Sequence, residues 1–147
     1  MPDSATFEGA AEGWRDARPK QSWAVDSNSL EPKHREQSVD AYELDDLTKE
    51  RRQSGERYLE FIRASTMSAG IYELRAGSAD PQRPHTEDEV YYVARGRASI
   101  HVAGEDRPVQ PGTVVFVAAG AEHRFHSIEE DLTVLVVFAP PRGSQAG

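Results

Sequence analysis

The stretch that decides the fold is HTEDEVYYVARG, residues 85–96, together with a second stretch, PGTVVFVAAGAEH, residues 111–123. Each combines an apolar run typical of a β-strand with glycines at turns and with residues that can bind a metal. Imidazole and carboxylate groups are ligands that divalent iron, zinc, manganese and nickel use in proteins. If neighbouring strands hold them, His85, Glu89 and His123 can form one site.

Further strand-like runs lie on both sides of these two stretches, and no helical pattern separates them. Gly96-Arg97, Gly104 to Asp106, Pro111-Gly112 and Ala119-Gly120 supply turn signals between the runs. Many short strands with Gly/Pro turns predict an all-β fold, an antiparallel sandwich or barrel, over residues 56–140. The predicted strands cover residues 58–63, 67–74, 89–94, 98–102, 113–117 and 132–138.

The two ends of the chain lack this pattern. Residues 1–37 mix Gly, Pro, Ser and charged residues without a sustained period, which predicts an irregular N-terminal leader. Trp14 and Trp23 are the exceptions there, and we expect them to pack on the domain or on a partner subunit. Residues 141–147 are predicted to form a C-terminal tail.

A short helix is predicted between the leader and the strands, within residues 38–55. Asp40 and Glu43 have the spacing of a capping box, and apolar residues follow at helical spacing. Gly55 supplies the stop signal for this helix.

Composition excludes several classes of function. The 147 residues carry a net charge of −8 with no cluster of lysine or arginine, so we expect no nucleic-acid partner. The absence of cysteine excludes disulfides and thiolate metal ligands. No apolar stretch is long enough for a signal peptide or a membrane span, so we expect a cytoplasmic protein with no membrane partner.

The spacing of the first stretch resembles the first motif of the cupin superfamily, small β-barrels of the jelly-roll type. That motif ends in a His, three residues, a Glu, six residues and a Gly, as do His85, Glu89 and Gly96 here. The resemblance covers roughly residues 56–140 and implies a cupin-type jelly-roll β-barrel.

The second stretch resembles the second cupin motif, which runs Gly, five residues, Pro, one residue, Gly, two residues, His, three residues, Asn. Gly112, Gly120 and His123 match this spacing, whereas Ala118 stands for the Pro and Ser127 for the Asn.

One departure from the family pattern affects the ligand set. The first motif usually begins His-x-His, and Arg83 occupies the position of the first His. A guanidinium has only donors and cannot bind a cation. In another alignment, His85 takes the position of the first His and Glu87 replaces the second His. The stretch between Glu87 and Glu89 is then shorter than in the family motif. The simplest metal set is His85, Glu89 and His123, with Gln82 or Glu87 as a possible fourth ligand.

Other residues near the motifs are candidates for a substrate pocket. Tyr91 shares the strand parity of Glu89, and Phe125 that of His123, so both are expected to point inward, as core residues or as substrate contacts. Arg83 could bind a substrate carboxylate with two hydrogen bonds, or could be a solvent-exposed loop residue.

The remaining acidic and histidine residues are expected to lie outside the metal site. Glu87 and Asp88 read as a solvated turn, and His126 lies three residues beyond His123 and should face the other side of its strand. His34 lies in the polar leader, and the pattern does not assign His101 to either face.

Two imidazoles and one carboxylate leave coordination positions for a substrate, which favours a reactive site over a structural one. The resemblance implies one divalent metal ion, Fe, Zn, Mn or Ni, and permits oxygenase-like or isomerase/lyase-like chemistry on a small molecule. A non-catalytic module that binds or senses a small ligand with the metal as anchor is the alternative. A third possibility is a metal-free barrel in which His85 and His123 hydrogen-bond across the pocket.

We also expect a homodimer, because small barrels often cover apolar edges with a second copy.

Overall fold

A computed structural model describes residues 38–145 of the chain. Contacts divide the chain into two units, Met1–Ala41 and Tyr42–Gly147, and every described helix and strand lies in the second. The expectations for the leader, including Trp14, Trp23 and His34, fall outside the described residues.

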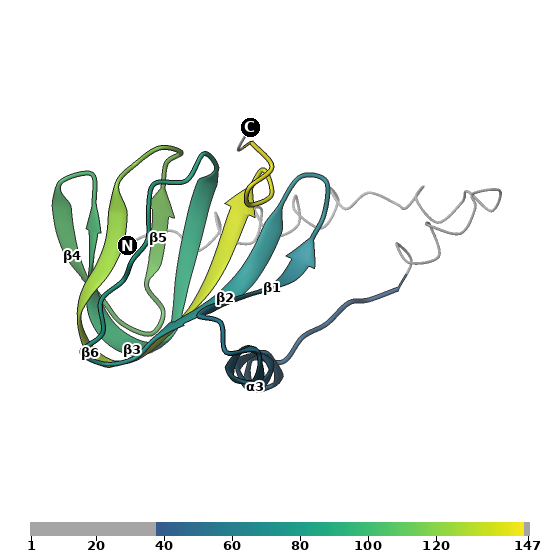
Figure 1. Ribbon diagram of the computed structural model, residues 1–147, viewed down its shortest axis with the longest axis horizontal. Helices are drawn as coiled ribbons and strands as arrows, with labels where there is room; N and C mark the ends of the chain where they lie inside the picture. The colour runs from purple at the N-terminus through teal and green to yellow at the C-terminus, as the bar shows by residue number, and fades with distance from the viewer. Residues whose placement is uncertain (1–37, 146–147) are drawn as a thin grey trace, which may run out of the picture. The chain divides into compact units, whose positions relative to one another are not determined.

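The second unit consists of antiparallel strands and one short helix (Figure 1). The strands form a sheet in the order β1-β2-β6-β3-β4, with β5 pairing with β3 beside this path. The predicted all-β fold is therefore confirmed. The elements are α3 (Leu44–Ser54), β1 (Tyr58–Arg63), β2 (Ser68–Leu74), β3 (Asp88–Val102), β4 (Glu105–Val109), β5 (Val114–Val117) and β6 (His123–Ala139).

Two long strands, β3 and β6, pair with each other and curve the sheet around its core. The first part of β3 also pairs with β5 and its last part with β4. Register shifts between Val93 and Ser99 interrupt the β3–β6 ladder, and such bulges bend a strand pair. Figure 1 shows the resulting bend, with β4 on one side and β1 and β2 on the other. The inward side chains form one apolar core, which includes Tyr72, Leu74, Tyr91, Val93, Ile100, Val109, Phe125, Val134, Val136 and Phe138.

The strand β3 is continuous where the sequence predicts a turn, so the prediction of two strands separated at Gly96-Arg97 is wrong. Gly96 has a φ of 93°, and a Cβ there would lie 2.3 Å from the carbonyl oxygen of Asp131 on β6. The glycine is therefore needed because the β6 backbone passes close to it.

The sequence does not predict β4, because its charged sequence EDRPV has no apolar alternation.

Helix α3 is shorter than the predicted range of 38–55. Glu43, and not Asp40, is the N-cap, and no side chain caps the helix. The predicted stop is confirmed, since Gly55 adopts a left-handed conformation with a φ of 77° and its N–H donates to the carbonyl of Arg52. Arg51 joins the helix to β2, with its Nε 2.6 Å from Oε1 of Glu73.

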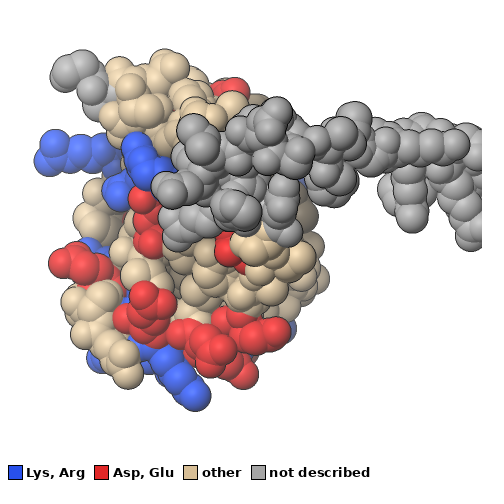
Figure 2. All heavy atoms as spheres, turned by 90° about the vertical axis from the view of Figure 1, so that its right-hand side faces the viewer, with Lys and Arg blue, Asp and Glu red and all other residues tan. Residues whose placement is uncertain are grey.

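Acidic side chains gather at the bottom of the face drawn in Figure 2, at the level where Figure 1 places α3. The first turn of this helix carries Asp45 and Asp46. At eleven residues, α3 is too short to cross a bilayer, and no other helix occurs in the part of the chain that the structure describes.

Candidate metal centre

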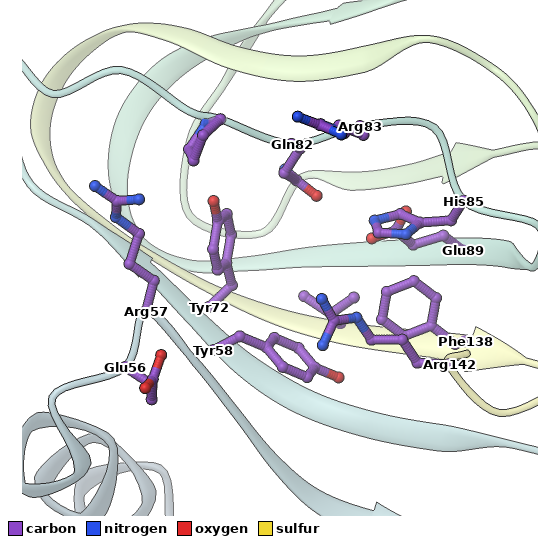
Figure 3. A pocket seen from close by; sticks show the side chains of 12 residues that line it. Glu56, Arg57, Tyr58, Tyr72, Gln82, Arg83, His85, Glu89, Phe138 and Arg142 are labelled. Carbon is purple, nitrogen blue, oxygen red and sulfur yellow. The ribbon is translucent and has the colours of Figure 1, made fainter. Parts of the chain in front are cut away.

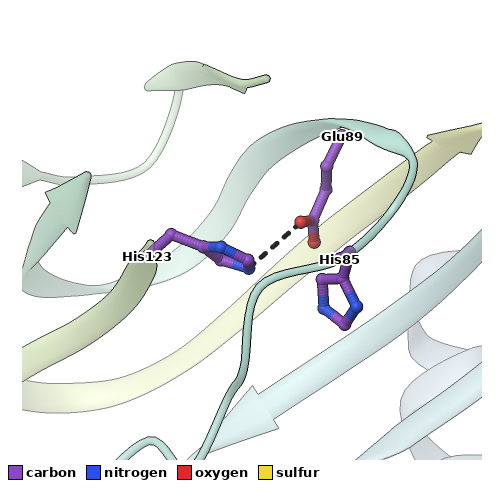
Figure 4. Close-up of side chains that lie close together, drawn as sticks. All are labelled: His85, Glu89 and His123. Carbon is purple, nitrogen blue, oxygen red and sulfur yellow. Dashed lines mark ion pairs between the residues drawn. The ribbon is translucent and has the colours of Figure 1, made fainter. Parts of the chain in front are cut away.

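The three predicted metal ligands come close together, as Figure 4 shows. Glu89 lies near the start of β3, His123 is the first residue of β6, and His85 lies in the segment before β3. One ligand atom from each residue lies within 4.8 Å of the other two. Glu89 and His123 are buried and His85 is half-buried. The structure thus brings the trio together, and metal binding by it stays a prediction.

Backbone contacts hold the two ligand-bearing segments against each other. The N–H of Gly120 donates to the carbonyl of His85 at 2.7 Å. The N–H of Ala119 donates to Oδ1 of Asp88 at 2.9 Å. These bonds join the segment before β3 to the turn before β6. They explain how His85 and His123, which are 38 positions apart in the sequence, come close together. Asp88 is exposed, as predicted, but its carboxylate also fixes this junction.

The orientation of His123 is set by its own turn. Its Nδ1 lies 2.9 Å from the carbonyl oxygen of Ala121, which can only accept, so Nδ1 carries the hydrogen. In the neutral imidazole, Nε2 then presents a lone pair. This nitrogen lies 3.2 Å from Oε2 of Glu89, as the dashed line in Figure 4 marks.

The trio contains buried polar atoms with no hydrogen-bond partner among the described residues. They are both carboxylate oxygens of Glu89 and Nε2 of His123. The 3.2 Å approach between Glu89 and His123 is an ion-pair distance that lacks hydrogen-bond geometry. A buried carboxylate without compensation is costly, and a proton on His123 or a bound cation would balance its charge.

The two histidines differ in their affinity for protons. Burial lowers the pKa of His85 below its ordinary value; the charges of His123 and Arg142 also lower it, whereas Glu89 acts in the opposite direction. Burial also acts to lower the pKa of His123, but its contacts with Glu89 and the Ala121 carbonyl outweigh burial and raise this pKa. Without a metal, His123 is therefore the group that takes up a proton to balance Glu89.

The two suggested fourth ligands have other contacts. Oε1 of Gln82 accepts from the Tyr91 hydroxyl at 2.9 Å, and Nε2 donates to Oδ2 of Asp80 at 2.6 Å. Glu87 accepts a hydrogen bond from the hydroxyl of Thr86. Glu87 is also buried, with 3% of its surface exposed, so the prediction that it lies in a solvated turn is wrong. Glu87 does not belong to the cluster of convergent ligand atoms, and both oxygen-bearing groups are engaged in these hydrogen bonds.

Asp80 organises the loop that carries Gln82 and His85, and sequence reasoning missed it. Its carboxylate accepts from the Tyr72 hydroxyl at 2.6 Å and from the backbone N–H of Phe125 at 2.8 Å. Tyr72 lies on β2, eight residues before Asp80, and Phe125 lies on β6, 45 residues after it. No local pattern around Asp80 could have indicated them.

A cavity of about 470 Å³ opens beside the trio, with His85 and Glu89 in its wall (Figure 3). Arg83 lines this cavity, and its role in binding a substrate stays a prediction. Tyr91 and Phe125 point inward as predicted but belong to the core, with ring centroids 5.0 Å apart, and neither is among the residues lining the cavity. Sequence reasoning missed Arg142 in the predicted tail. The full lining comprises Glu56, Arg57, Tyr58, Tyr72, Pro81, Gln82, Arg83, His85, Glu89, Val136, Phe138 and Arg142.

Two other histidines lie outside this site. His126 contacts Asp106, with Nε2 2.7 Å from Oδ1, and is separate from the trio, as predicted. His101 approaches the same carboxylate oxygen at 3.2 Å, so it shares the outer side of the strands with His126. The predicted alternative of a hydrogen bond between His85 and His123 is not seen in residues 38–145, where their rings lie 5.2 Å apart.

Comparisons with known proteins agree with this architecture. Residues 70–138 match the family model described as "Cupin domain". An uncharacterized protein from Streptomyces coelicolor is 52% identical over 101 residues, which cover 69% of this chain and 96% of that protein. A solved structure from Thermus thermophilus has a TM-score of 0.57 at 26% identity and covers 70% of this chain and 99% of that one.

More distant solved structures show the fold alone. One from Bacillus halodurans has a TM-score of 0.60 at 17% identity, over 71% of this chain and 83% of that chain. The structure of KdgF from Halomonas sp. has a TM-score of 0.54 at 22% identity, over 58% and 79% of the two chains. Because the family model of the cupin domain matches residues 70–138, the chain belongs to the cupin superfamily.

Proposed function

We propose that this protein is a metal-dependent enzyme that acts on a small molecule, with one divalent metal ion held by His85, Glu89 and His123. One observation carries the proposal: Nε2 of His123 and both Glu89 oxygens are buried, close together and without hydrogen-bond partners. Acceptor atoms arranged in this way match what a cation requires from its ligands.

The chemistry of the donor set fits such an ion. Two imidazole nitrogens and one carboxylate suit iron, zinc, manganese or nickel and leave coordination positions for a substrate. When bound, the metal would supply Lewis-acid or redox chemistry, the basis of isomerase-, lyase- and oxygenase-type reactions.

The residues of the chain would orient the ligands and admit the substrate. The Ala121 carbonyl fixes the tautomer of His123, a contact of the kind that orients metal-binding histidines. The ring of Tyr91 lies 6.2 Å from that of His123 and packs against Phe125 in the apolar core, so His123 borders the core on that side. The cavity beyond His85 and Glu89 gives a small molecule access from the other side.

Metal analysis of the full chain, purified without added metal and then loaded and desalted, tests the proposal. We expect about one divalent ion per chain, and its loss in a His85→Ala/His123→Ala variant. His126→Ala is the matched control, because His126 lies outside the trio and should leave metal content unchanged. Full occupancy in the double variant would place the metal elsewhere.

Turnover distinguishes an enzyme from the alternative of a binding or sensing module. An enzyme must convert a substrate with the metal present and stop when the metal is removed. A module that binds its ligand through the metal and returns it unchanged would contradict the catalytic part of the proposal.

A further inference from the structure

Three arginines line the cavity beside the trio: Arg57, Arg83 and Arg142 (Figure 3). Within residues 38–145, none of their guanidinium groups has an ion pair or a hydrogen bond. Arg51 and Arg63, by contrast, are paired with glutamates. A guanidinium has five N–H donors, so each of the three cavity arginines has its donors available to a ligand.

Arg142 is the best placed of the three. Its backbone N–H donates to Oγ of the fully buried Ser68 at 2.9 Å, and its carbonyl accepts from Nη1 of Arg63 at 3.2 Å. Its guanidinium carbon lies 4.8 Å from the centroid of the Tyr58 ring, a cation–π distance. Figure 3 shows the guanidinium over this ring, directed into the cavity. The side chain is thus held in place at both its base and its tip before any ligand arrives.

Tyr58 adds a second unused donor at the same place. Its hydroxyl is buried and has no hydrogen-bond partner among the described residues. The ring lies so close to β2 that a Cβ on Gly70 would come within 2.4 Å of the hydroxyl oxygen. A buried hydroxyl without a partner is unfavourable, and a ligand oxygen beside Arg142 would satisfy it.

The charge of the cavity identifies the kind of ligand. Three arginines face two glutamates, Glu56 and Glu89, and a divalent ion at the trio would add two more positive charges. This local excess contrasts with the net charge of −8 for the whole chain. A cation near an unpaired guanidinium is repelled unless an anion lies between them.

We propose that the cavity binds a small organic anion, with one carboxylate or phosphate group held by Arg142 and the Tyr58 hydroxyl beside the metal trio. This inference rests on the proposed function for the metal and adds the class of the ligand. A volume of about 470 Å³ suits a small molecule. Arg57 and Arg83 add further positive charge to the wall of the same cavity.

Calorimetric titration of the metal-loaded full chain tests the proposal. The probes are malonate, succinate, glutarate and inorganic phosphate, with succinamide as the uncharged counterpart of succinate. We expect at least one anion to bind, and any binding of succinate to be at least 10-fold tighter than that of succinamide. The comparison of phosphate with the dicarboxylates identifies which acidic group the site prefers. Absence of binding by all four anions, or equal binding of succinate and succinamide, would overturn the proposal.

Variants then assign the binding to Arg142. Arg142→Gln should weaken the best-bound anion at least 10-fold, and Arg142→Lys should weaken it less because the charge remains. Tyr58→Phe removes only the hydroxyl and should cost a few-fold in affinity. Arg97→Gln is the control, since Arg97 is exposed on β3 and does not line the cavity.

Metal content separates this inference from the proposed function. Arg142→Gln should keep the full metal content of the wild type while it loses the anion. If the anion binds as tightly in Arg142→Gln as in the wild type while the metal is retained, only this inference fails. If wild-type protein holds no metal at the trio, the proposed function fails first.

Discussion

At the scale of single residues, the charge of Glu89 and the protonation of His123 control metal binding at the site. The carboxylate is buried, and a proton on His123 or a metal can balance its charge. Both cannot be present at once, because a metal needs the lone pair of Nε2. Proton and metal therefore compete for the same position.

In the metal-free protein, the two histidines should titrate on opposite sides of the ordinary histidine pKa. The pKa of His123 is raised, so it should titrate above the ordinary value of about 6.5, whereas His85 should titrate below it. Glu89→Gln removes the carboxylate that favours the charged imidazole, so the pKa of His123 should fall. NMR titration of the imidazole ring signals measures both values.

The raised pKa of His123 also determines how metal binding depends on pH. Because His123 holds its proton to a higher pH than an ordinary histidine, the metal affinity should already decrease as the pH falls through that raised pKa. An unchanged His123 titration in Glu89→Gln would show that the carboxylate does not control it.

The trio could be predicted from sequence because its members sit at fixed spacings beside turns. Ser127, at the position of the family's Asn, has a φ of 50°, a left-handed conformation that Asn adopts more readily than Ser. Asp80 and Arg142 could not be predicted in the same way. Their partners Tyr72, Phe125 and Ser68 lie on strands that only the folded sheet brings near.

At the scale of elements, the glycines of the strands distinguish a turn from a close approach of two backbones. Gly104 and Gly96 both have a positive φ, 88° and 93°. A Cβ on Gly104 would meet no atom within 4 Å, whereas one on Gly96 would overlap the Asp131 carbonyl on β6. In the sequence the two glycines look alike, which is why a turn was predicted at both.

This difference predicts unequal costs for two alanine substitutions. Gly104→Ala should lower the free energy of unfolding by about 1 kcal/mol, through backbone strain alone. Gly96→Ala adds the displacement of β6 and should cost about 3 kcal/mol or more. Urea denaturation of the two variants measures both values. Equal costs would mean that β6 does not restrict the residue at position 96.

At the scale of the whole molecule, the outer face of β3 and β5 exposes large apolar side chains. Val90 pairs with Phe116 and Tyr92 with Val114 across the two strands, so the four form one surface, the β3–β5 patch. Val114 and Phe116 are more than half exposed, at 64% and 61%. Contiguous apolar side chains on a surface mark an interaction site.

We propose that a second copy of this chain covers the β3–β5 patch. The patch consists of apolar side chains from two adjacent strands, and a two-fold contact can place it against the same patch of a partner.

A Tyr92→Lys/Phe116→Lys variant tests this dimer. We expect the wild-type chain to sediment as a dimer and the variant as a monomer, because the lysines would have to be buried unpaired in the contact. Both side chains already face away from the barrel core, so the fold and the metal content should be retained.

Glu129→Lys, at an exposed position of β6 outside the patch, is the control for added positive charge and should stay dimeric. Analytical ultracentrifugation over a range of concentrations measures the outcome, and a double variant that sediments like the wild type would show that the β3–β5 patch is not the contact.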